Sequence, residues 1–548
     1  MLPTYQQRNR RKKGGFRDAS VFNCSTNTLL MWVVGFFIFT TLAPMLFLME
    51  WGGGGGGGSG GDGGSPITGP PGGPPFEPQQ QTDSKFDAET QRRQASVREG
   101  FLHAWNSYKQ YAWGWDELQP LTMKGKNWFG RSGMGATILD AMDTMWLMGY
   151  THEFDEAKQF ISQLDFGKIE GTVSTFETTI RALGGLLSCY ALDGDPMFLE
   201  KAEDLGVRLL KAFPAGSKMP KASVSLTTGT GSYPSWTGGN AILSEVGTIQ
   251  LEFMYLAKLT RNAEFARQVS EVVDVLDDQE KPGNLYTIYL EPKTGKMKHG
   301  TCSLNTFLLY IVNSCTLVFV VCLNVIESRV TMGALGDSWY EYLLKMWLLT
   351  NEQVPKFRRM YNEAVQGIMD YMVATSVPNQ LTYIAELNSA VKKQKITKMD
   401  HLVCFAGGMF ALGAYKNVDP VNREKHLELG KELTRTCHES YKRMPTGIGP
   451  EVIEFNPLRV GGKDLGSQVH DYLLRPGFVS FLPSLLSLSL GVLPFPSSLL
   501  SRSSFQLFSF SIIIIFFQNR NRGELLYIVA DNARSDLQGM GMGSMASH

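Results

Sequence analysis

Apolar residues recur along most of this chain at the spacing of three and four that is typical of helices with one buried face. The clearest case is Thr172–Leu192, where an apolar stripe predicts a helix. From about residue 95 to 475 the pattern repeats as a helix, a short polar turn and a second helix, which predicts antiparallel helix hairpins. Serial hairpins form either an open solenoid or a closed double ring, and periodicity does not choose between them. The stripe consists of Phe176, Ile180, Leu183, Leu187 and Tyr190, and the other expected helices are Pro196–Phe213, Ala241–Leu259, Ala263–Asp278, Asp337–Leu349, Val354–Thr375, Met409–Tyr415 and Arg423–Arg443.

The N-terminal part of the chain departs from this pattern. A basic segment, 1–27, precedes 22 uncharged residues, 28–49, which are long enough to span a bilayer as a helix. The basic side is expected to stay cytoplasmic, so the rest of the chain would be luminal or extracellular. A Gly- and Pro-rich stretch, 50–94, follows and predicts a flexible stem. We therefore predict a signal anchor and not a cleaved signal peptide; the alternative is a buried core helix.

Composition narrows the function further. Lys plus Arg and Asp plus Glu both number 52 in 548 residues, which argues against a nucleic-acid partner. The sequence shows no Ser-His-Asp order, zinc-type Cys-x-x-Cys spacing, phosphate-binding glycine loop or His-Glu-x-x-His helix. Seven cysteines are present, and some would pair in an oxidising compartment. Cys404 and Cys437 are the best candidates, because both lie in ordinary globular sequence.

The stripe of Thr172–Leu192 carries an acid and a base one helical turn apart, Glu177 and Arg181. Residues four apart share a helix face. A carboxyl group among apolar neighbours is costly to ionise, which is how a glutamate becomes a general acid. The alternative is a structural ion pair at a helix packing seam, and the segment alone favours that alternative.

Carboxylates and aromatic residues gather together at several hairpin ends, each expected within a helix. Six such motifs in one domain suggest a shared acidic cavity lined with aromatic rings. Sugars offer hydroxyls to carboxylates and apolar faces to rings, and glycoside hydrolysis typically uses two carboxylates. The motifs lie in Trp105–Leu118, Leu139–Trp146, Ser244–Phe253, Gly336–Tyr342, Tyr383–Glu386 and Met399–Phe405.

Through these motifs and their order, residues 98–476 resemble class I α-1,2-mannosidases, glycoside hydrolase family 47, which trim high-mannose N-glycans. The resemblance implies an all-α, (αα)7 barrel in 95–476 and an inverting, calcium-dependent hydrolysis. Cys404–Gly413, Arg435–Tyr441 and Leu335 are similar to the Golgi branch, whereas the endoplasmic-reticulum branch usually has Arg in place of Leu335. That branch implies a single-pass Golgi membrane protein with a luminal catalytic domain.

The resemblance also implies roles for individual residues. Glu177 matches the general acid, thought to act through a water, and Asp337 matches a second catalytic carboxylate. Cys404 and Cys437 match the family disulfide. Asp140 and Asp143 stay open between site and structural roles. The residues that match substrate-binding positions are Arg181, Glu245, Asp400, His401 and Arg475.

Two departures from the family pattern change the expectation for this chain. An apolar insertion, 302–329, separates segments that are almost contiguous in the family. Gly477 stands where the family motif Leu-Arg-Pro-Glu has its favoured catalytic base, and 477–548 carries none of the family's C-terminal motifs, including the threonine that holds Ca²⁺. Our hypothesis is that the insertion is a retained intron or a gene-model error. At Gly477 we infer that translation has run into an intron, because glutamate codons begin with G and introns commonly begin with GT, so an unspliced junction there would give Gly.

These departures predict a barrel without its last helices, which exposes apolar faces, folds poorly and lacks activity. Two further classes of function stay open. A non-hydrolytic glycan-binding protein of glycoprotein quality control would tolerate Gly477. A helical scaffold would have no use for Glu177.

Overall fold

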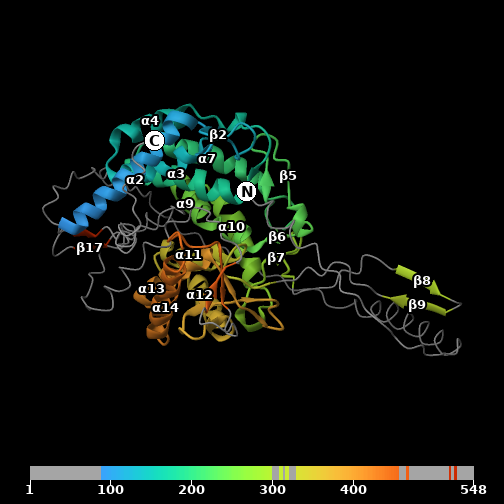
Figure 1. Cartoon of the computed structure of the whole chain (residues 1–548). Coiled ribbons are helices and arrows are strands. Elements are labelled where there is room, and N and C mark those ends of the chain that lie inside the picture. Colours follow the sequence, from blue (N-terminus) through green and yellow to red (C-terminus); the bar gives the residue numbers. More distant parts are fainter. Residues whose placement is uncertain are drawn as a thin grey trace, which may run out of the picture. The chain divides into compact units, whose positions relative to one another are not determined.

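The computed structural model describes residues 88–298, 308–312, 315–319, 329–455, 464–467, 517–519 and 524–526 (Figure 1). The expected cytoplasmic tail and anchor, most of the stem, much of the insertion and Arg475 lie outside these residues. Within the part that is described, no helix is both long enough and apolar enough to cross a membrane.

The described body is mostly helical, as the periodicity predicts. Helix α11 has the predicted bounds, Asp337–Leu349, and α14 begins at the predicted Arg423. Helix α2 begins at Ala88, earlier than the predicted domain start at residue 95. The remaining helices are α3 (Ala136–Met148), α4 (Thr151–Gln163), α5 (Thr175–Glu177), α6 (Gly184–Asp193), α7 (Pro196–Leu209), α8 (Leu243–Gly247), α9 (Gln250–Thr260), α10 (Ala263–Asp277), α12 (Pro355–Tyr371), α13 (Phe405–Tyr415) and α14 (Arg423–Lys442); α2 ends at Ala112.

Consecutive helices pack as antiparallel hairpins, of which α13 and α14 are an example in Figure 1. The first helices of the hairpins also contact one another in series, α3 with α6, α6 with α9, α9 with α11 and α11 with α13. These helices are buried on nearly all sides: every residue of Ser338–Trp347 in α11 is buried. Their partners bury one face, as α12 does through Phe357, Met360, Tyr361, Ala364 and Ile368. A helix that is apolar all round belongs inside and an amphipathic one outside, so the hairpins form an inner and an outer layer.

Two predicted helices are interrupted. Residues Ala241–Ile242 form a strand, β6, and the helix that follows breaks at Thr248, whose φ of −130° is not helical. At this break the hydroxyl of Thr248 donates to Ser338 Oγ of α11 at 2.8 Å, a tertiary contact that local periodicity does not encode. The predicted helix Thr172–Leu192 contains a π-helical stretch, Thr178–Leu183, between α5 and α6.

Two acidic motifs that were expected in helices lie instead in short strands, so that expectation is wrong. Tyr383 lies in β11 and Glu386 in β12, while Asp400 ends β14. The strands β11 and β12 pair antiparallel with the nearby β10 and β13, whereas β14 pairs with β15, far along the chain. The described strands are β1 (Glu117–Gln119), β2 (Lys124–Lys126), β3 (Val173–Ser174), β4 (Ser223–Val224), β5 (Gly231–Ser232), β6, β7 (Tyr289–Leu290), β8 (Leu308–Val312), β9 (Cys315–Phe319), β10 (Val373–Thr375), β11 (Thr382–Ile384), β12 (Glu386–Leu387), β13 (Lys395–Ile396), β14 (Lys398–Asp400), β15 (Val452–Phe455), β16 (Leu465–Gly466), β17 (Phe517–Asn519) and β18 (Glu524–Leu526).

Candidate active site

The candidate acids lie at the N-terminal ends of the inner helices. Glu177 ends α5, Glu245 lies in α8, Asp337 is the first residue of α11, and Asp400 and His401 lie just before α13. Because each hairpin returns the chain, successive inner helices run in the same direction and their N-termini share one end of the layer. The positive ends of helix dipoles favour carboxylates there.

Glu177 and Arg181 form an ion pair that also includes Asp140 of α3. The Nε of Arg181 donates to Glu177 Oε2 at 2.7 Å, and its Nη1 donates to Asp140 Oδ2 at 2.8 Å. The Arg181 guanidinium also lies over the ring of Trp128, 5.9 Å from its centroid. Burial lowers the pKa of Arg181, but the two carboxylates outweigh burial and raise it, so Arg181 stays positively charged. We call Asp140, Glu177 and Arg181 the Arg181 cluster.

The local backbone orients Glu177. Ser174 Oγ caps the turn by accepting from the Glu177 amide at 3.1 Å, and the π-helical stretch begins at the next residue. Such π-helical turns occur frequently at functional sites. Among the described residues, none donates to Glu177 Oε1, which leaves that oxygen for a substrate or a water.

Asp143 follows Asp140 by about one turn of α3 and is buried. Ser188 Oγ donates to Asp143 Oδ2 at 3.0 Å. Burial, with repulsion from Asp140, raises the pKa of Asp143 to about 6 despite the Ser188 bond. Of the two residues that the sequence left open, Asp140 therefore joins the cluster and Asp143 supports the packing of α3 against α6.

Glu245 has a different environment from Glu177. No cation bonds its carboxyl group within the part of the chain that the structure describes. Burial, followed by repulsion from the Glu177 carboxylate, raises the pKa of Glu245 to about 7. Glu245 can therefore carry a proton near neutral pH, and the packing of α5 against α8 places it near Glu177.

The loop before α11 brings Asp337 to the same end. The amide of Asp337 donates to Gly333 O at 2.9 Å, and Ser244 N donates to Leu335 O at 3.0 Å, which fixes the loop beside Glu245. Leu335 has a φ of 78°, an unusual conformation for a leucine that this double attachment enforces.

A second ion cluster borders that loop. Lys398 Nζ donates to Glu386 Oε1 at 2.7 Å and to Asp400 Oδ1 at 3.0 Å. Burial and repulsion from Asp400 raise the pKa of Glu386, although Lys398 opposes both. We call Glu386, Lys398 and Asp400 the Lys398 cluster.

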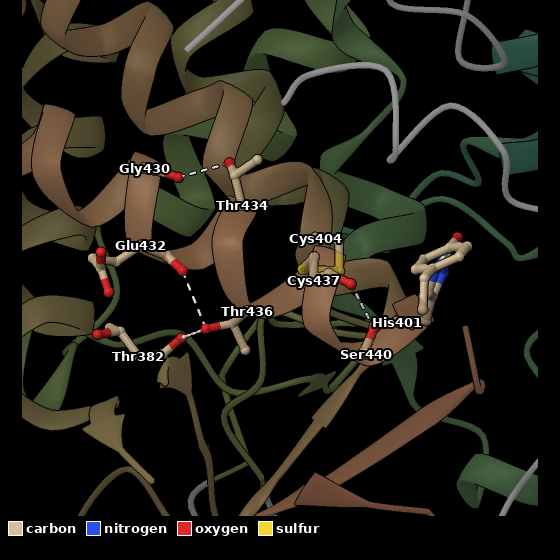
Figure 2. Close-up of a disulfide and its surroundings, with 10 residues drawn as sticks. Thr382, His401, Cys404, Gly430, Glu432, Thr434, Thr436, Cys437 and Ser440 are labelled. Carbon is tan, nitrogen blue, oxygen red and sulfur yellow. Dashed lines mark hydrogen bonds between the residues drawn. A yellow bond between two sulfur atoms is a disulfide. The ribbon is translucent and has the colours of Figure 1, made fainter. Parts of the chain in front are cut away.

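His401 is buried next to the disulfide (Figure 2). Its Nε2 lies 2.6 Å from the hydroxyl of Tyr441 in α14, and its amide donates to Glu451 O at 2.8 Å. Cys404 and Cys437 are bonded, with an S–S distance of 2.09 Å, and join the start of α13 to α14. The structure thus contains the expected disulfide and holds His401 on a cross-linked hairpin.

Sequence reasoning missed several residues that support the site. Lys398 and Tyr441 were not singled out: Lys398 lies two residues before Asp400 in β14, and Tyr441 reaches His401 from α14, far along the chain. Asp116 was noted only within an aromatic motif. Its carboxylate accepts from four backbone amides, at 2.7 to 3.1 Å, in the loop that carries Trp128 and starts α3. The donors are Trp128, Phe129, Met134 and Ala136.

Among the described residues, no group of three or more His, Cys, Asp or Glu residues is placed to hold a metal ion. The calcium threonine of the family was not expected in this sequence.

The body consists of two layers of helix hairpins, and an acidic site bridged by cations lies at one end of the inner layer. These features are those of an all-helical protein with a candidate glycosidase site. The chain belongs to glycosyl hydrolase family 47, whose model matches residues 100–482. It is 40% identical over 400 residues to mannosyl-oligosaccharide alpha-1,2-mannosidase IA of Drosophila melanogaster, covering 72% of this chain and 55% of the relative. It is 39% identical over 399 residues to mannosyl-oligosaccharide 1,2-alpha-mannosidase IA of Sus scrofa, with coverages of 72% and 55%.

The fold matches that of a solved structure, the alpha-1,2-mannosidase from Trichoderma reesei. The TM-score is 0.60 at 21% sequence identity, and the match covers 80% of this chain and 88% of that chain. The chain therefore shares a fold with that protein, and it spans little more than half the length of the Drosophila and Sus relatives.

Proposed function

We propose that this site is built to hydrolyse terminal α-1,2-linked mannose from high-mannose N-glycans. The family match and the names of the relatives support this substrate. The observation that carries the proposal is the Glu177 carboxylate, which Arg181 holds by one oxygen at the acidic end of the inner layer.

The residues have separable tasks in this proposal. In its protonated form, Glu177 delivers a proton to the leaving oxygen, directly or through a water, and Arg181 orients its carboxyl group. Glu245, with a pKa near 7, donates a hydrogen bond to a sugar hydroxyl. Asp337 is proposed as a second carboxylate of an inverting mechanism, in which a carboxylate activates a water on the far side of the sugar. Arg181, Asp400 and His401 line the sugar site, and Arg475 is proposed to join them from outside the described residues.

The closure of the barrel, the calcium ion and the location in the cell are also part of the proposal. The hairpins would close as an (αα)7 barrel, Ca²⁺ would bind sugar hydroxyls when its family site is present, and 28–49 would anchor the chain in the Golgi membrane. The uncharged length of 28–49 and the similarity to the Golgi branch support this location.

Gly477 favours a second function. A chain without the carboxylate that follows Leu-Arg-Pro in the family would bind the glycan and hydrolyse it poorly. We propose that the chain as written has low or no activity, and glycan binding without hydrolysis is the alternative function. Transcript reads that cross residues 302–329 and 477 without a splice, together with mannosidase activity of this chain, would contradict the intron hypothesis.

The test uses the purified full chain and a Man9 glycan. Mannose release and glycan binding are measured for the parent, for Glu177→Gln and for Glu117→Gln, a control whose carboxylate pairs with Lys126 in the β1–β2 hairpin. Any mannose release by the parent should fall roughly 10²- to 10⁴-fold in Glu177→Gln and stay unchanged in Glu117→Gln, as expected for the loss of a general acid. Binding without release in the parent would establish the alternative, and absence of both would refute both functions.

A further inference from the structure

The Lys398 cluster lies deeper in the protein than a surface ion pair does. The exposed fraction of the Lys398 side chain is 17%, against 6% for Glu386 and 13% for Asp400. Glu386 and Asp400 share Lys398, and Glu386 Oε2 also lies 3.8 Å from Nη1 of the more exposed Arg329. Removing Lys398 would therefore leave both carboxylates largely buried without the cation that they share. Burial lowers the pKa of Lys398, but Asp400 and Glu386 outweigh burial and raise it, so the lysine stays charged.

Glu386 connects this lysine to the loop that precedes α11. Its Oε1 accepts from Thr331 Oγ1 at 3.3 Å, and the same hydroxyl accepts from the amide of Gly333 at 2.8 Å. The carbonyl of Gly333 then accepts from the amide of Asp337. An unbroken series of hydrogen bonds therefore runs from Lys398 to the first residue of α11.

Asp400 holds the same loop from another side. A Cβ built on Gly333 would lie 2.6 Å from Asp400 Oδ2 and 2.8 Å from its Cβ, so only glycine allows this approach. Both carboxylates that Lys398 holds thus contact the loop at Thr331 or Gly333. The backbone pairing of Val330 with Leu387, next to Glu386, secures the start of the loop.

We propose that Lys398 is a positioning residue that fixes the loop 331–337 and thereby sets the place of Asp337 opposite Glu245 and Glu177. Lys398 acts through Glu386 and Asp400 and does not touch the substrate itself. Its importance for sugar binding rests on the proposed function, whereas its hold on the loop does not.

The first readout is amide hydrogen exchange of the full chain, compared for Lys398→Met, Lys398→Arg and Lys416→Met. Lys416 is a matched control, because its side chain is 10% exposed and it pairs with Glu352 at 3.0 Å, outside the site. Lys398→Met should speed exchange in 331–337 by roughly tenfold while α12 keeps its protection. Lys398→Arg should restore protection, and Lys416→Met should leave the loop unchanged.

The second readout is binding of α-1,2-mannobiose by calorimetry. Lys398→Met should weaken binding about tenfold and Lys398→Arg should recover most of it, with similar melting temperatures for Lys398→Met and Lys416→Met. Unchanged exchange in 331–337, or exchange that rises equally in α12, would overturn the proposal. If the parent binds no sugar, the proposed function fails, and the exchange result alone decides the role of Lys398.

Discussion

The Arg181 cluster and the Lys398 cluster place one cation between two carboxylates, but they differ in burial and in geometry. Side chains of the Arg181 cluster are 26 to 34% exposed, whereas those of the Lys398 cluster are 6 to 17% exposed. Arg181 reaches its partners with two nitrogens of a planar fork, and Lys398 reaches both with one nitrogen. The more open cluster offers a carboxylate oxygen to a ligand, and the closed one holds a loop.

A buried aspartate lies in the structure that surrounds each cluster: Asp116 in the loop that carries Trp128, and Asp464 just before β16, which shares a sheet with β14. Asp116, 1% exposed, accepts the four amides of the loop before α3. Asp464, fully buried, accepts from Ser376, Asn379 and Arg443 beside the β10–β11 turn. Burial raises the pKa of Asp464, but these donors outweigh it and lower the pKa to about 2.

The largest expected effect comes from Asp116→Asn. The amide group keeps one acceptor oxygen but turns a donor toward two backbone amides, so buried donors lose their partners. We expect a loss of roughly 3 to 5 kcal/mol of unfolding free energy in urea, since each bond to a charged acceptor contributes about 1.5–3 kcal/mol. Hydrogen exchange should rise in α3 and near Trp128.

Asp464→Asn is the matched variant for that experiment. It should loosen the β10–β11 turn and leave α3 protected, while Asp116→Asn should leave 331–337 protected. If either variant loosens both regions equally, the two clusters are not separately supported, and the comparison between them fails.

The next largest effect concerns Glu245, which belongs to neither cluster and whose contribution to stability depends on pH. Its pKa in the folded chain, about 7, exceeds the ordinary 4.5, so the folded state holds the proton more tightly than the unfolded state does. The stability from this group is therefore fully present below pH 4.5 and is lost as pH rises through 7. Glu245→Gln should match the parent at pH 4 and exceed its stability at pH 8 by up to about 3 kcal/mol.

Glu252 provides the control for this titration. It is fully buried, Tyr342 donates to it at 2.8 Å, and burial raises its pKa to about 7 as well. Glu252→Gln should reproduce the gain in stability at pH 8 but leave sugar binding intact, whereas Glu245→Gln should weaken it. Equal effects on binding would remove Glu245 from the proposed sugar site.

A smaller effect is expected from Arg181→Lys. A single ammonium does not reproduce two directed bonds to Glu177 and Asp140, so one contact is lost while the charge remains. We expect about 1 kcal/mol of lost stability, because the pair is partly exposed, and a clear loss of sugar affinity. The exposed triad around Arg267, which contacts Glu264 and Glu271, is the control.

Arg267→Lys should leave the unfolding midpoint and sugar binding unchanged. Since Lys398→Arg is expected to restore function and Arg181→Lys to lose it, the two exchanges test whether geometry or charge matters in each cluster. If both Lys398→Arg and Arg181→Lys keep sugar binding, charge alone suffices in each cluster. The proposed difference in geometry between the two clusters would then have no functional meaning.

The helices were largely predictable because their periodicity is local. The bounds of α11 and the start of α14 follow from apolar spacing alone. The break at Thr248 was not predictable from local spacing, and it coincides with a hydrogen bond from the Thr248 hydroxyl to Ser338, far along the chain. Glu177 and Arg181 were found since they are four apart on one helix, whereas Lys398 meets Glu386 only through the pairing of short strands.

The catalytic assignment of Glu177 came from its resemblance to a family and not from spacing, and spacing alone favoured a structural ion pair. The structure shows that ion pair, with Asp140 as a third member. An ion pair and a catalytic site are therefore compatible here, and the sequence posed them as alternatives because it did not reveal the open oxygen of Glu177.

The smallest effect is expected from deleting the insertion, which tests whether both clusters are independent of it. Lys298 N donates to Tyr289 O, and Ile288 N donates to Arg329 O, so the chain leaves and returns beside adjacent residues of one extended segment. The backbone N–H and C=O groups of successive residues in an extended segment point to opposite sides. The two chain segments that pair with it on either side therefore lie about 10 Å apart.

Deleting residues 302–328 leaves His299, Gly300 and Thr301 between these two attachment points. Four Cα-to-Cα steps reach about 13 Å, enough to span the gap without moving Arg329. The strands β8 and β9 pair with each other, from Leu308 with Phe319 to Val312 with Cys315, so the deletion removes a hairpin as a whole. The shortened chain should melt within a few degrees of the parent and protect 331–337 from exchange equally well. A large fall in melting temperature, or a loosened loop, would show that the insertion is a working part of the fold and would argue against its origin as an intron.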